Sequence, residues 1–323
     1  MNVLRSYPFL YLLGAALSIA VYVSFSTPIA GYFGDAVQYK MNGTAVAAPV
    51  KAVLVKESYD SLGVVYIDAK DFAGIRQPVR ISQTNELKVG DVFVADISYD
   101  PPTQSYTLVQ VVRRNPMMTF ALIPGLGELG RNLLFHVPMS MVAFLAFLIG
   151  TIYSILYLVK KKPDYDRSAR ASSAVGLMFT LLSTITGSVW ARFSWGTFWN
   201  WDPREVSIFI LLLIYFAYFI LRSLLEESEE KKARIAAVYN IIAFVSVPFL
   251  MFVVPRITQS LHPGGGGGEA PIINTSATPV HTDPTLLNMH WLNVLLFILV
   301  FLWLKDLYTR VLRIEDARTE SLS

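Results

Sequence analysis

The sequence predicts a membrane protein of the all-α class: a bundle of six transmembrane helices, with a small β domain inserted between helices 1 and 2. Three observations predict this fold class. The chain is 54% apolar and only 16% charged, with a mean hydropathy of +0.47. Six apolar runs approach the roughly 20 residues that a helix needs to cross a bilayer. The long segment between the first two runs has the residue pattern of β-strands.

The six apolar runs are expected to be the membrane-crossing helices. They cover residues 8–25, 137–159, 172–190, 206–223, 236–254 and 291–305. The first run is short and follows a weakly basic start, as in a secretory signal peptide. The residues after it lack a clean small-x-small cleavage pattern. We therefore interpret residues 1–30 as a first transmembrane anchor.

Residues 46–114, which follow the first span, are expected to form a small OB-like barrel or a sandwich on the outer side. Five short runs rich in Val, Ile, Thr and Tyr are separated by turn signals such as Gly90-Asp91 and Asp100-Pro101-Pro102. The pattern from Leu87 to Ala95, which enters the fourth run, is typical of an OB-like strand entry. The runs are Val50–Lys56, Val64–Ile67, Val79–Ile81, Val92–Ser98 and Tyr106–Val112.

The Lys and Arg residues predict the orientation of the spans. They are concentrated in the connections 160–170 and 222–234 and in the tail that begins at Lys305. Cytoplasmic loops carry such an excess, so six spans with both termini in the cytoplasm satisfy the pattern. The net charge is only +3, which argues against a nucleic-acid partner. The chain has no Cys, which excludes disulfides and thiolate metal sites.

The outer connection at 190–205 is rich in tryptophan. Four of the six Trp of the chain lie here: Trp190, Trp195, Trp199 and Trp201. Anchoring at the membrane interface needs about one or two Trp per helix end. A denser cluster, closed by Asp202-Pro203-Arg204-Glu205, predicts a surface that holds a large flat ligand. Asp202 and Pro203 also fit the N-cap and the first position of the fourth span.

Two histidines are expected at the same depth as this loop. His136 begins the second span, and His262 follows the fifth. Two imidazoles beside an aromatic surface are what a bis-histidine haem site requires, and guanidinium groups suit its anionic propionates. Arg131, Arg192, Arg204 and Arg256 lie on the same side. An interfacial or capping role is the alternative for each His. His290, beside Trp291, is the reserve ligand, whereas His281 lies in a polar loop.

The motif Trp195-Gly196-x-x-Trp199-x-Trp201-Asp202, with an outer His on either side, resembles the haem-handling proteins of cytochrome c biogenesis. Within that group it is most similar to the CcmC family, which also has six spans. The strings Arg131-x4-His136-x-Pro138 and Ser260-Leu261-His262-Pro263 are similar to the two His motifs of that family. The chain departs from it in three places: residues 257–260 lack aromatic side chains, residues 202–205 are closer to CcsA, and the β insert replaces a short loop.

The resemblance implies a function for the membrane body, residues 131–310. It would bind haem b non-covalently, with His136 and His262 as the metal ligands. The cofactor-binding residues would also include Trp190, Trp195, Trp199, Trp201, Asp202, Arg131 and Arg204. The protein would sit in membrane lipid of the bacterial inner membrane and present haem to a CcmE-like haem chaperone, together with CcmA, CcmB and CcmD-type subunits. No residue is assigned a catalytic role.

The β insert is not expected to bind haem itself. An anchor helix followed by an OB-like domain is similar to CcmE, but residues 27–135 contain no His, so the insert is not expected to carry haem covalently.

A CcsA-type haem lyase is the main alternative function of the whole chain. An electron-transfer cytochrome b would need His at mid-membrane depth, and a non-haem scaffold would bind no pigment. No span has an ionisable residue near its centre, which argues against an ion or proton pathway.

Overall fold

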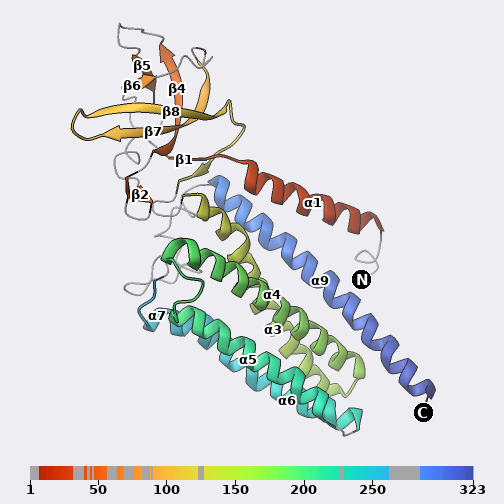
Figure 1. Ribbon diagram of the computed structural model, residues 1–323. Coiled ribbons are helices and arrows are strands. Elements are labelled where there is room, and N and C mark those ends of the chain that lie inside the picture. Colours follow the sequence, from red (N-terminus) through yellow and green to blue (C-terminus); the bar gives the residue numbers. More distant parts are fainter. Residues whose placement is uncertain are drawn as a thin grey trace. The chain divides into compact units, whose positions relative to one another are not determined.

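Six helices long and apolar enough to cross a membrane are present among the residues described in the computed structural model (Figure 1), as the sequence predicts. The described residues are 7–31, 40–41, 44–45, 47–56, 64–68, 76–81, 88, 90–122, 127–225, 228–261 and 284–322. The main helices are α1 (Tyr7–Ser26), α3 (Leu133–Lys160), α4 (Pro163–Trp195), α5 (Pro203–Leu224), α6 (Glu229–Pro248) and α9 (Pro284–Leu322).

Contacts divide the chain into two compact units. One comprises residues 1–20, 132–278 and 290–323 and contains the helical bundle. The other comprises residues 21–131 and 279–289 and contains the β domain. Each unit has its own core.

Helix α4 extends well beyond the predicted span in both directions. It begins at Pro163, a residue favoured in the first turn of a helix, and Asp164 and Asp166 in that turn complement the helix dipole. It ends only at Trp195, because Gly196 adopts a left-handed conformation with φ of 88°. The prediction that Trp195 lies in the connection is therefore wrong, since it is helical; Trp190, the last residue of the predicted span 172–190, is helical as that span predicts.

The core of the helical unit lies between α3, α4, α5, α6 and α9. Phe147 of α3 stacks on Tyr215 of α5 with ring centroids 3.6 Å apart. Gly176 of α4 makes room for Phe147, because a Cβ at this glycine would lie 2.8 Å from the ring. The fully buried side chains Leu211 of α5, Val247 of α6 and Phe301 of α9 complete this layer.

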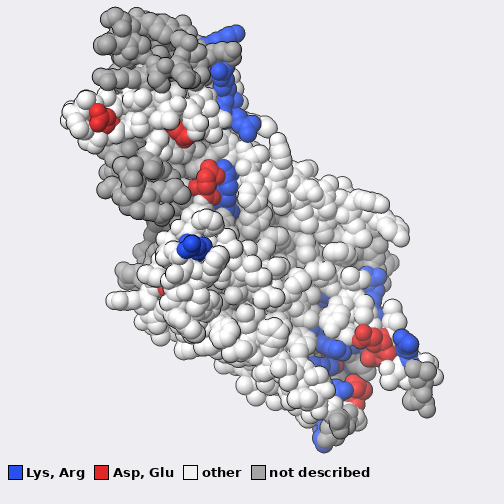
Figure 2. Space-filling view, viewed as in Figure 1, with Lys and Arg blue, Asp and Glu red and all other residues white. Residues whose placement is uncertain are grey.

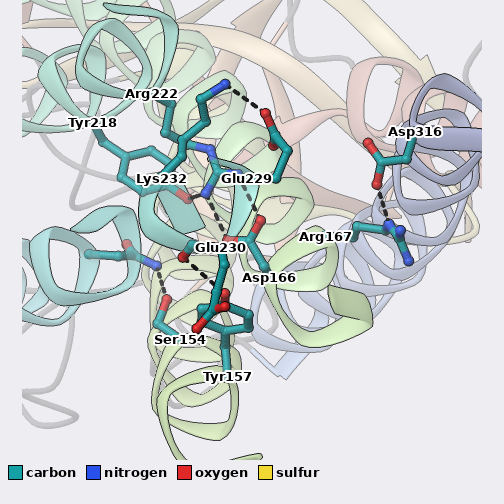
Figure 3. Close-up of polar contacts among 11 residues, drawn as sticks. Ser154, Tyr157, Asp166, Arg167, Tyr218, Arg222, Glu229, Glu230, Lys232 and Asp316 are labelled. Atoms are coloured by element: carbon teal, nitrogen blue, oxygen red, sulfur yellow. Dashed lines mark hydrogen bonds and ion pairs between the residues drawn. The ribbon is translucent and has the colours of Figure 1, made fainter. Parts of the chain in front are cut away.

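One end of the bundle, which we call the basic end, is formed by the α3–α4 and α5–α6 connections and the last turns of α9. Lys, Arg, Asp and Glu gather here on the face drawn in Figure 2, while the sides of the helices are almost free of charge. Arg222 and Asp166 form a bidentate ion pair at 2.8 and 2.7 Å with little exposure (Figure 3). Arg167 and Asp316 connect α4 to α9 at 2.6 Å. These ion pairs therefore also stabilise the packing of α4 against α5 and α9.

The fifth span is not a single helix. Residues Phe249–Val253 form a π-helix, η3, and Val254–Ile257 form the short helix α7. The sequence predicts only a kink at Pro248. Proline lacks an N–H donor and crowds the preceding turn, and single-turn π-helices inside α-helices are frequent at functional sites. The chain emerges from α7 toward Thr258–Leu261.

The β unit contains the five predicted strands. They are β4 (Ala48–Lys56), β5 (Val64–Asp68), β6 (Arg76–Ile81), β7 (Val92–Asp100) and β8 (Ser105–Arg114), and they close into a barrel in the order β4-β5-β6-β8-β7. All neighbours are antiparallel except β6 and β8. Buried Val50, Phe93 and Ile97 contribute to its interior.

Two further strand pairs in the β unit were not predicted. The strands β1 (Ile29–Ala30) and β9 (Phe120–Ala121) pair in parallel, and β2 (Lys40–Met41) and β3 (Thr44–Ala45) form a short antiparallel pair. Each strand has only two residues, too few for an alternation of side chains to be recognised in a sequence. The β1–β9 pair joins the two chain segments that flank the barrel.

Candidate functional site

The tryptophan-rich segment lies at the other end of the helical unit, where α3 begins, α4 ends and α5 begins. We call this region the tryptophan end. Its indoles form two edge-to-face pairs: Trp190 with Trp195, with centroids 4.9 Å apart, and Trp199 with Trp201, 5.9 Å apart. Trp190 is only 6% exposed, whereas Trp201 is 73% exposed. One pair is therefore anchored in the bundle, and the other presents an aromatic surface.

The turn between α4 and α5 is held by its own hydrogen bonds. The Gly196 N–H donates to the Arg192 carbonyl, and the Arg192 guanidinium donates to the Gly196 carbonyl. The same guanidinium lies over the Phe198 ring. Trp201 has φ of +58°, which a bulky side chain rarely adopts. Such strain persists only where surrounding contacts impose it, and it is concentrated at functional sites.

Those contacts come from the start of α5, as the sequence predicts. The Asp202 carboxylate accepts from the Arg204 N–H at 2.9 Å. In return the Glu205 carboxylate accepts from the N–H groups of Asp202 and Asn200. These reciprocal bonds are a capping box. They fix the backbone on both sides of Trp201 and so hold its strained conformation.

Asp202 has a second role that the sequence did not predict. Its two carboxylate oxygens accept from the Ser260 hydroxyl at 2.9 Å, and one of them accepts from the Leu261 N–H at 2.7 Å. Asp202 is only 4% exposed. Asp202 therefore ties the tryptophan-rich turn to the two residues that precede His262 in the sequence.

Arg204 offers positive charge at this end. It is half-buried, and its Nε and Nη2 atoms are buried without a hydrogen-bond partner among the described residues. A buried guanidinium nitrogen that makes no hydrogen bond is costly, so the site favours an added acceptor. The planar guanidinium suits a carboxylate or another anion.

Arg131 lies in a different environment, in the β unit. It is the penultimate residue of a 3-10 helix, η2 (Gly127–Asn132), and is 9% exposed. Its guanidinium donates to the carbonyls of Ser24 and Thr27, both at 2.7 Å, and to the Glu128 carboxylate at 2.5 Å. These bonds connect the end of α1 with the approach to α3, so Arg131 already has a structural role.

His136 lies in the first turn of α3 and faces α4. Its Nδ1 is 3.0 Å from the Ser183 carbonyl and 3.1 Å from the Thr186 hydroxyl. On α4 these residues precede Gly187 and Trp190, and the positions 183, 186, 187 and 190 share one helix face. The first predicted imidazole and the anchored indole are therefore attached to the same face of α4, about one turn apart.

Of the other three histidines, His290 lies within the described residues and two do not. His262 and His281 lie outside the described residues, as does the run of five glycines from Gly264 to Gly268. His290 is in α9, is 8% exposed, and contacts Trp291 edge to face at 5.5 Å. Asn293, one turn further along α9, donates to the Leu134 carbonyl at 2.8 Å, which fixes α9 against the start of α3.

Sequence reasoning missed Ser183, Thr186, Gly187 and Ser260. The first three were readable only as polar or small residues within an apolar run. Their spacing on one helix face was a signal, but the sequence did not show which residue of α3 faces them. Ser260 was noted as part of the second His string, without a role.

The chain matches known cytochrome c assembly proteins. The family described as "Cytochrome C assembly protein" matches residues 115–262, which begin just after the barrel and end at the second predicted ligand. The Heme exporter protein C of Paracoccus denitrificans (strain Pd 1222) is 31% identical over 175 residues, which are 54% of this chain and 69% of that protein.

Two further relatives show the range of this similarity. A putative cytochrome c biosynthesis ccmC-like mitochondrial protein of Marchantia polymorpha is 31% identical over 128 residues, 40% of this chain and 53% of that protein. The cytochrome c biogenesis protein CcsA of Chlamydomonas reinhardtii is 30% identical over 146 residues, 41% of this chain and 40% of that protein. The chain thus spans from less than half to about two thirds of these relatives.

The six candidate spans and these matches define the class: a multi-pass membrane protein that is similar to cytochrome c assembly proteins. The chain belongs to the family of CcmC-like cytochrome c assembly proteins.

Proposed function

We propose that the tryptophan end binds haem b non-covalently and presents it to a CcmE-type chaperone during cytochrome c biogenesis. Membership of the CcmC-like family supports a role in haem handling. The observation that carries the proposal is the attachment of an oriented imidazole, His136, to the same face of α4 as Trp190. The proposed iron ligand of α3 and the anchored indole of α4 are then held at the same contact between these two helices.

The chemistry of the described residues fits this cofactor. Haem would supply an iron that takes two axial nitrogen ligands and propionates that carry negative charge. Arg204 has buried guanidinium nitrogens without a partner among the described residues, which suits a propionate. The exposed indole of Trp201 and the half-buried indole of Trp199 would cover part of the macrocycle.

His262 is the proposed second ligand. It follows directly after Ser260 and Leu261, which are held by the Asp202 carboxylate. A fixed pair of residues immediately before His262 limits the positions that its imidazole can reach. In this proposal Asp202 contacts the protein rather than the cofactor, and it sets the distance between the second ligand and the tryptophans.

The orientation and the partners of the protein complete the proposal. The basic end would face the cytoplasm, with both chain termini there, because Lys and Arg are concentrated in its connections. The tryptophan end would then face the outer side of a bacterial inner membrane. CcmA, CcmB and CcmD-type subunits would accompany the chain, as the CcmC resemblance implies.

The barrel would be an accessory module of the OB-like type. Its strand order and its parallel β6–β8 pair support that assignment, since an OB-fold is a five-stranded Greek-key barrel. Residues 27–135 contain no His, so the barrel would not carry haem covalently. It would dock a partner or cover the bound haem.

A CcsA-type haem lyase is the second candidate function. The match to a CcsA protein and the CcsA-like residues Asp202-Pro203-Arg204-Glu205 favour it. In this case the chain would hold haem during its attachment to an apocytochrome. Co-purification separates the two functions: a CcmE-type protein supports presentation, and an apocytochrome c supports the lyase.

The test of the proposed function is the visible spectrum of the purified chain, with a pyridine haemochrome assay. Two imidazole ligands should give a low-spin haem b spectrum. His136→Ala and His262→Ala should each remove or convert that spectrum, whereas His281→Ala should not. The proposal would be contradicted if the purified wild-type protein contained no haem. It would also be contradicted if the variant that carries both His136→Ala and His262→Ala kept an unchanged low-spin spectrum.

A further inference from the structure

The position of His136 depends on three neighbouring residues of α4. The Ser183 carbonyl and the Thr186 hydroxyl are both within hydrogen-bond distance of Nδ1, at 3.0 and 3.1 Å. A Cβ added at Gly187 would lie 2.9 Å from Cε1 of the imidazole, 3.5 Å from Nδ1 and 3.8 Å from Nε2. The ring is therefore held at one nitrogen and packs directly over Gly187.

These contacts determine which ring nitrogen carries the proton. A carbonyl oxygen only accepts, so the bond to Ser183 requires a proton on Nδ1. The Thr186 hydroxyl is also within donating distance of the Leu182 and Ser183 carbonyls, at 2.9 and 3.1 Å. Its proton is directed to its own helix, and its oxygen can accept from Nδ1. In the neutral ring the lone pair is then on Nε2, the nitrogen suited to a metal.

The backbone that carries His136 is fixed as well. The Ser140 hydroxyl is within donating distance of the His136 carbonyl, at 3.2 Å, and lies 2.5 Å from the Ser183 hydroxyl. Asn132, at the start of α3, donates to the Thr186 carbonyl at 3.2 Å. Both ends of this turn of α3 are thus bonded to α4, so neither rotation of the ring nor movement of its backbone is free.

We propose that α4 sets the orientation and the basicity of the His136 imidazole as an iron ligand, with Thr186 and Gly187 as positioning residues. The inference rests on the proposed function, in which His136 ligates haem iron. Acceptors on Nδ1–H make the imidazole a stronger donor to iron. Loss of such an acceptor weakens metal binding and favours the reduced metal, because a poorer donor stabilises the oxidised state less.

The test compares variants of α4 in the purified full-length protein. Thr186→Val removes the hydroxyl at nearly constant volume and should weaken haem binding roughly tenfold, within the range for residues that orient metal ligands. It should also raise the haem midpoint potential. Thr186→Ser restores the hydroxyl and should restore both quantities. Gly187→Ala should displace the ring and increase the high-spin fraction of the spectrum.

Two controls lie on the same helix. Thr184→Val removes a hydroxyl that donates to Thr180 within α4. Gly176→Ala places a Cβ 2.8 Å from Phe147, in the core of the bundle, and so tests general damage to helix packing. Neither should change the midpoint potential or the spin state of bound haem.

The outcomes separate this inference from the proposed function. Nitrogen-15 NMR of the haem-free protein should show His136 protonated on Nδ1, and Thr186→Val should reduce that preference. If His136→Ala removes the low-spin spectrum while Thr186→Val and Gly187→Ala behave as wild type, the role of α4 is wrong and haem ligation stands. If His136→Ala leaves the spectrum unchanged, the proposed function itself is wrong.

Discussion

At the residue scale, the Asp202 carboxylate is the group that holds the tryptophan end together. It caps α5 through the Arg204 N–H and also accepts from Ser260 and Leu261, 58 and 59 positions away. A buried donor that loses its acceptor costs about 1–3 kcal/mol. Substitution of Asp202 therefore leaves several donors unpaired at once, on both sides of the site.

Asp202→Asn tests this double role. The amide keeps one acceptor oxygen but turns an NH2 group toward donors, so residues 260–261 should detach from the turn. We expect a lower melting temperature and a partial conversion of bound haem from low to high spin, as the ligand that follows Leu261 is lost. Ser260→Ala should have a smaller effect of the same kind. Asp316→Asn, at the basic end, is the control, and an unaltered spectrum in Asp202→Asn would refute the positioning role.

Arg204 is expected to hold a haem propionate. Charge-assisted hydrogen bonds contribute about 1.5–3 kcal/mol, so Arg204→Gln should weaken haem binding roughly tenfold to a hundredfold. Titration of the haem-free protein with haem measures this affinity. Arg234→Gln alters an exposed ion pair at the basic end and should bind haem as the wild type does. Equal affinity in the two variants would show that Arg204 does not contact the ligand.

Residue-level prediction succeeded where the information is local. The N-cap at Asp202 and the proline after it follow from a few adjacent residues, and the structure confirms both. The contacts of His136 with Ser183 and Thr186 join residues about 50 positions apart. They depend on the register of α3 against α4, which side-chain packing determines and which no short motif encodes.

At the element scale, helix ends explain most differences between prediction and structure. Apolar runs identify the six spans, but a helix continues through polar residues until a cap stops it. Thus α4 continues to Trp195, because the left-handed cap that ends it is at Gly196. In the fifth span a π-helix follows Pro248, and the short helix α7 follows it before the chain reaches Ser260. Hydropathy alone contains neither feature.

The hairpin of β7 and β8 has a pH-sensitive contact at its base. The Asp91 carboxylate accepts hydrogen bonds from the Lys88 backbone N–H and from the Asn115 side chain. These bonds, that of Lys88 most of all, hold the pKa of the Asp91 carboxyl below its ordinary value of 3.8. A lowered pKa in the folded state adds stability above the unfolded pKa, and this is lost as the pH falls through the folded pKa. The contribution is small because the Asp91 carboxyl lies at the surface, where solvent screens its interactions.

Hydrogen exchange of β7 amides should detect this effect. Protection, corrected for intrinsic exchange rates, should be constant well above the unfolded pKa and should fall as the pH drops through the lowered folded pKa of Asp91 in the wild type. Asp91→Asn should start with lower protection and show a flatter pH dependence. Lys88→Ala retains the donating backbone N–H and should largely keep the wild-type profile. A profile for Asp91→Asn identical to the wild type would rule out the contribution of this carboxylate.

At the scale of the whole molecule, the chain combines a family-typical membrane body with a barrel. The family match begins at residue 115, immediately after β8. All proposed iron ligands lie in the body, and the β1–β9 pair joins the segments on either side of the barrel. This arrangement leads us to expect that haem binding and haem handover depend on different parts of the chain.

Deletion of residues 46–114 separates the two activities. The shortened protein should retain its haem, since the deleted segment contains no His, and should transfer it more slowly to a CcmE-type chaperone. Haem content and transfer rate are measured side by side, with Arg234→Gln as a full-length control. If the shortened protein folds but no longer binds haem, the barrel supplies part of the pocket and the division into body and accessory module is wrong.

The central claim is that two particular imidazoles hold the haem iron at the tryptophan end. Electron–nuclear double resonance of the oxidised, nitrogen-15-histidine-labelled protein tests it directly, because it detects the nitrogens bound to iron. We predict two imidazole couplings in the wild type, of which one disappears in His136→Ala and the other in His262→Ala, while His290→Ala retains both. A single coupling in the wild type, or loss of a coupling in His290→Ala, would contradict this account.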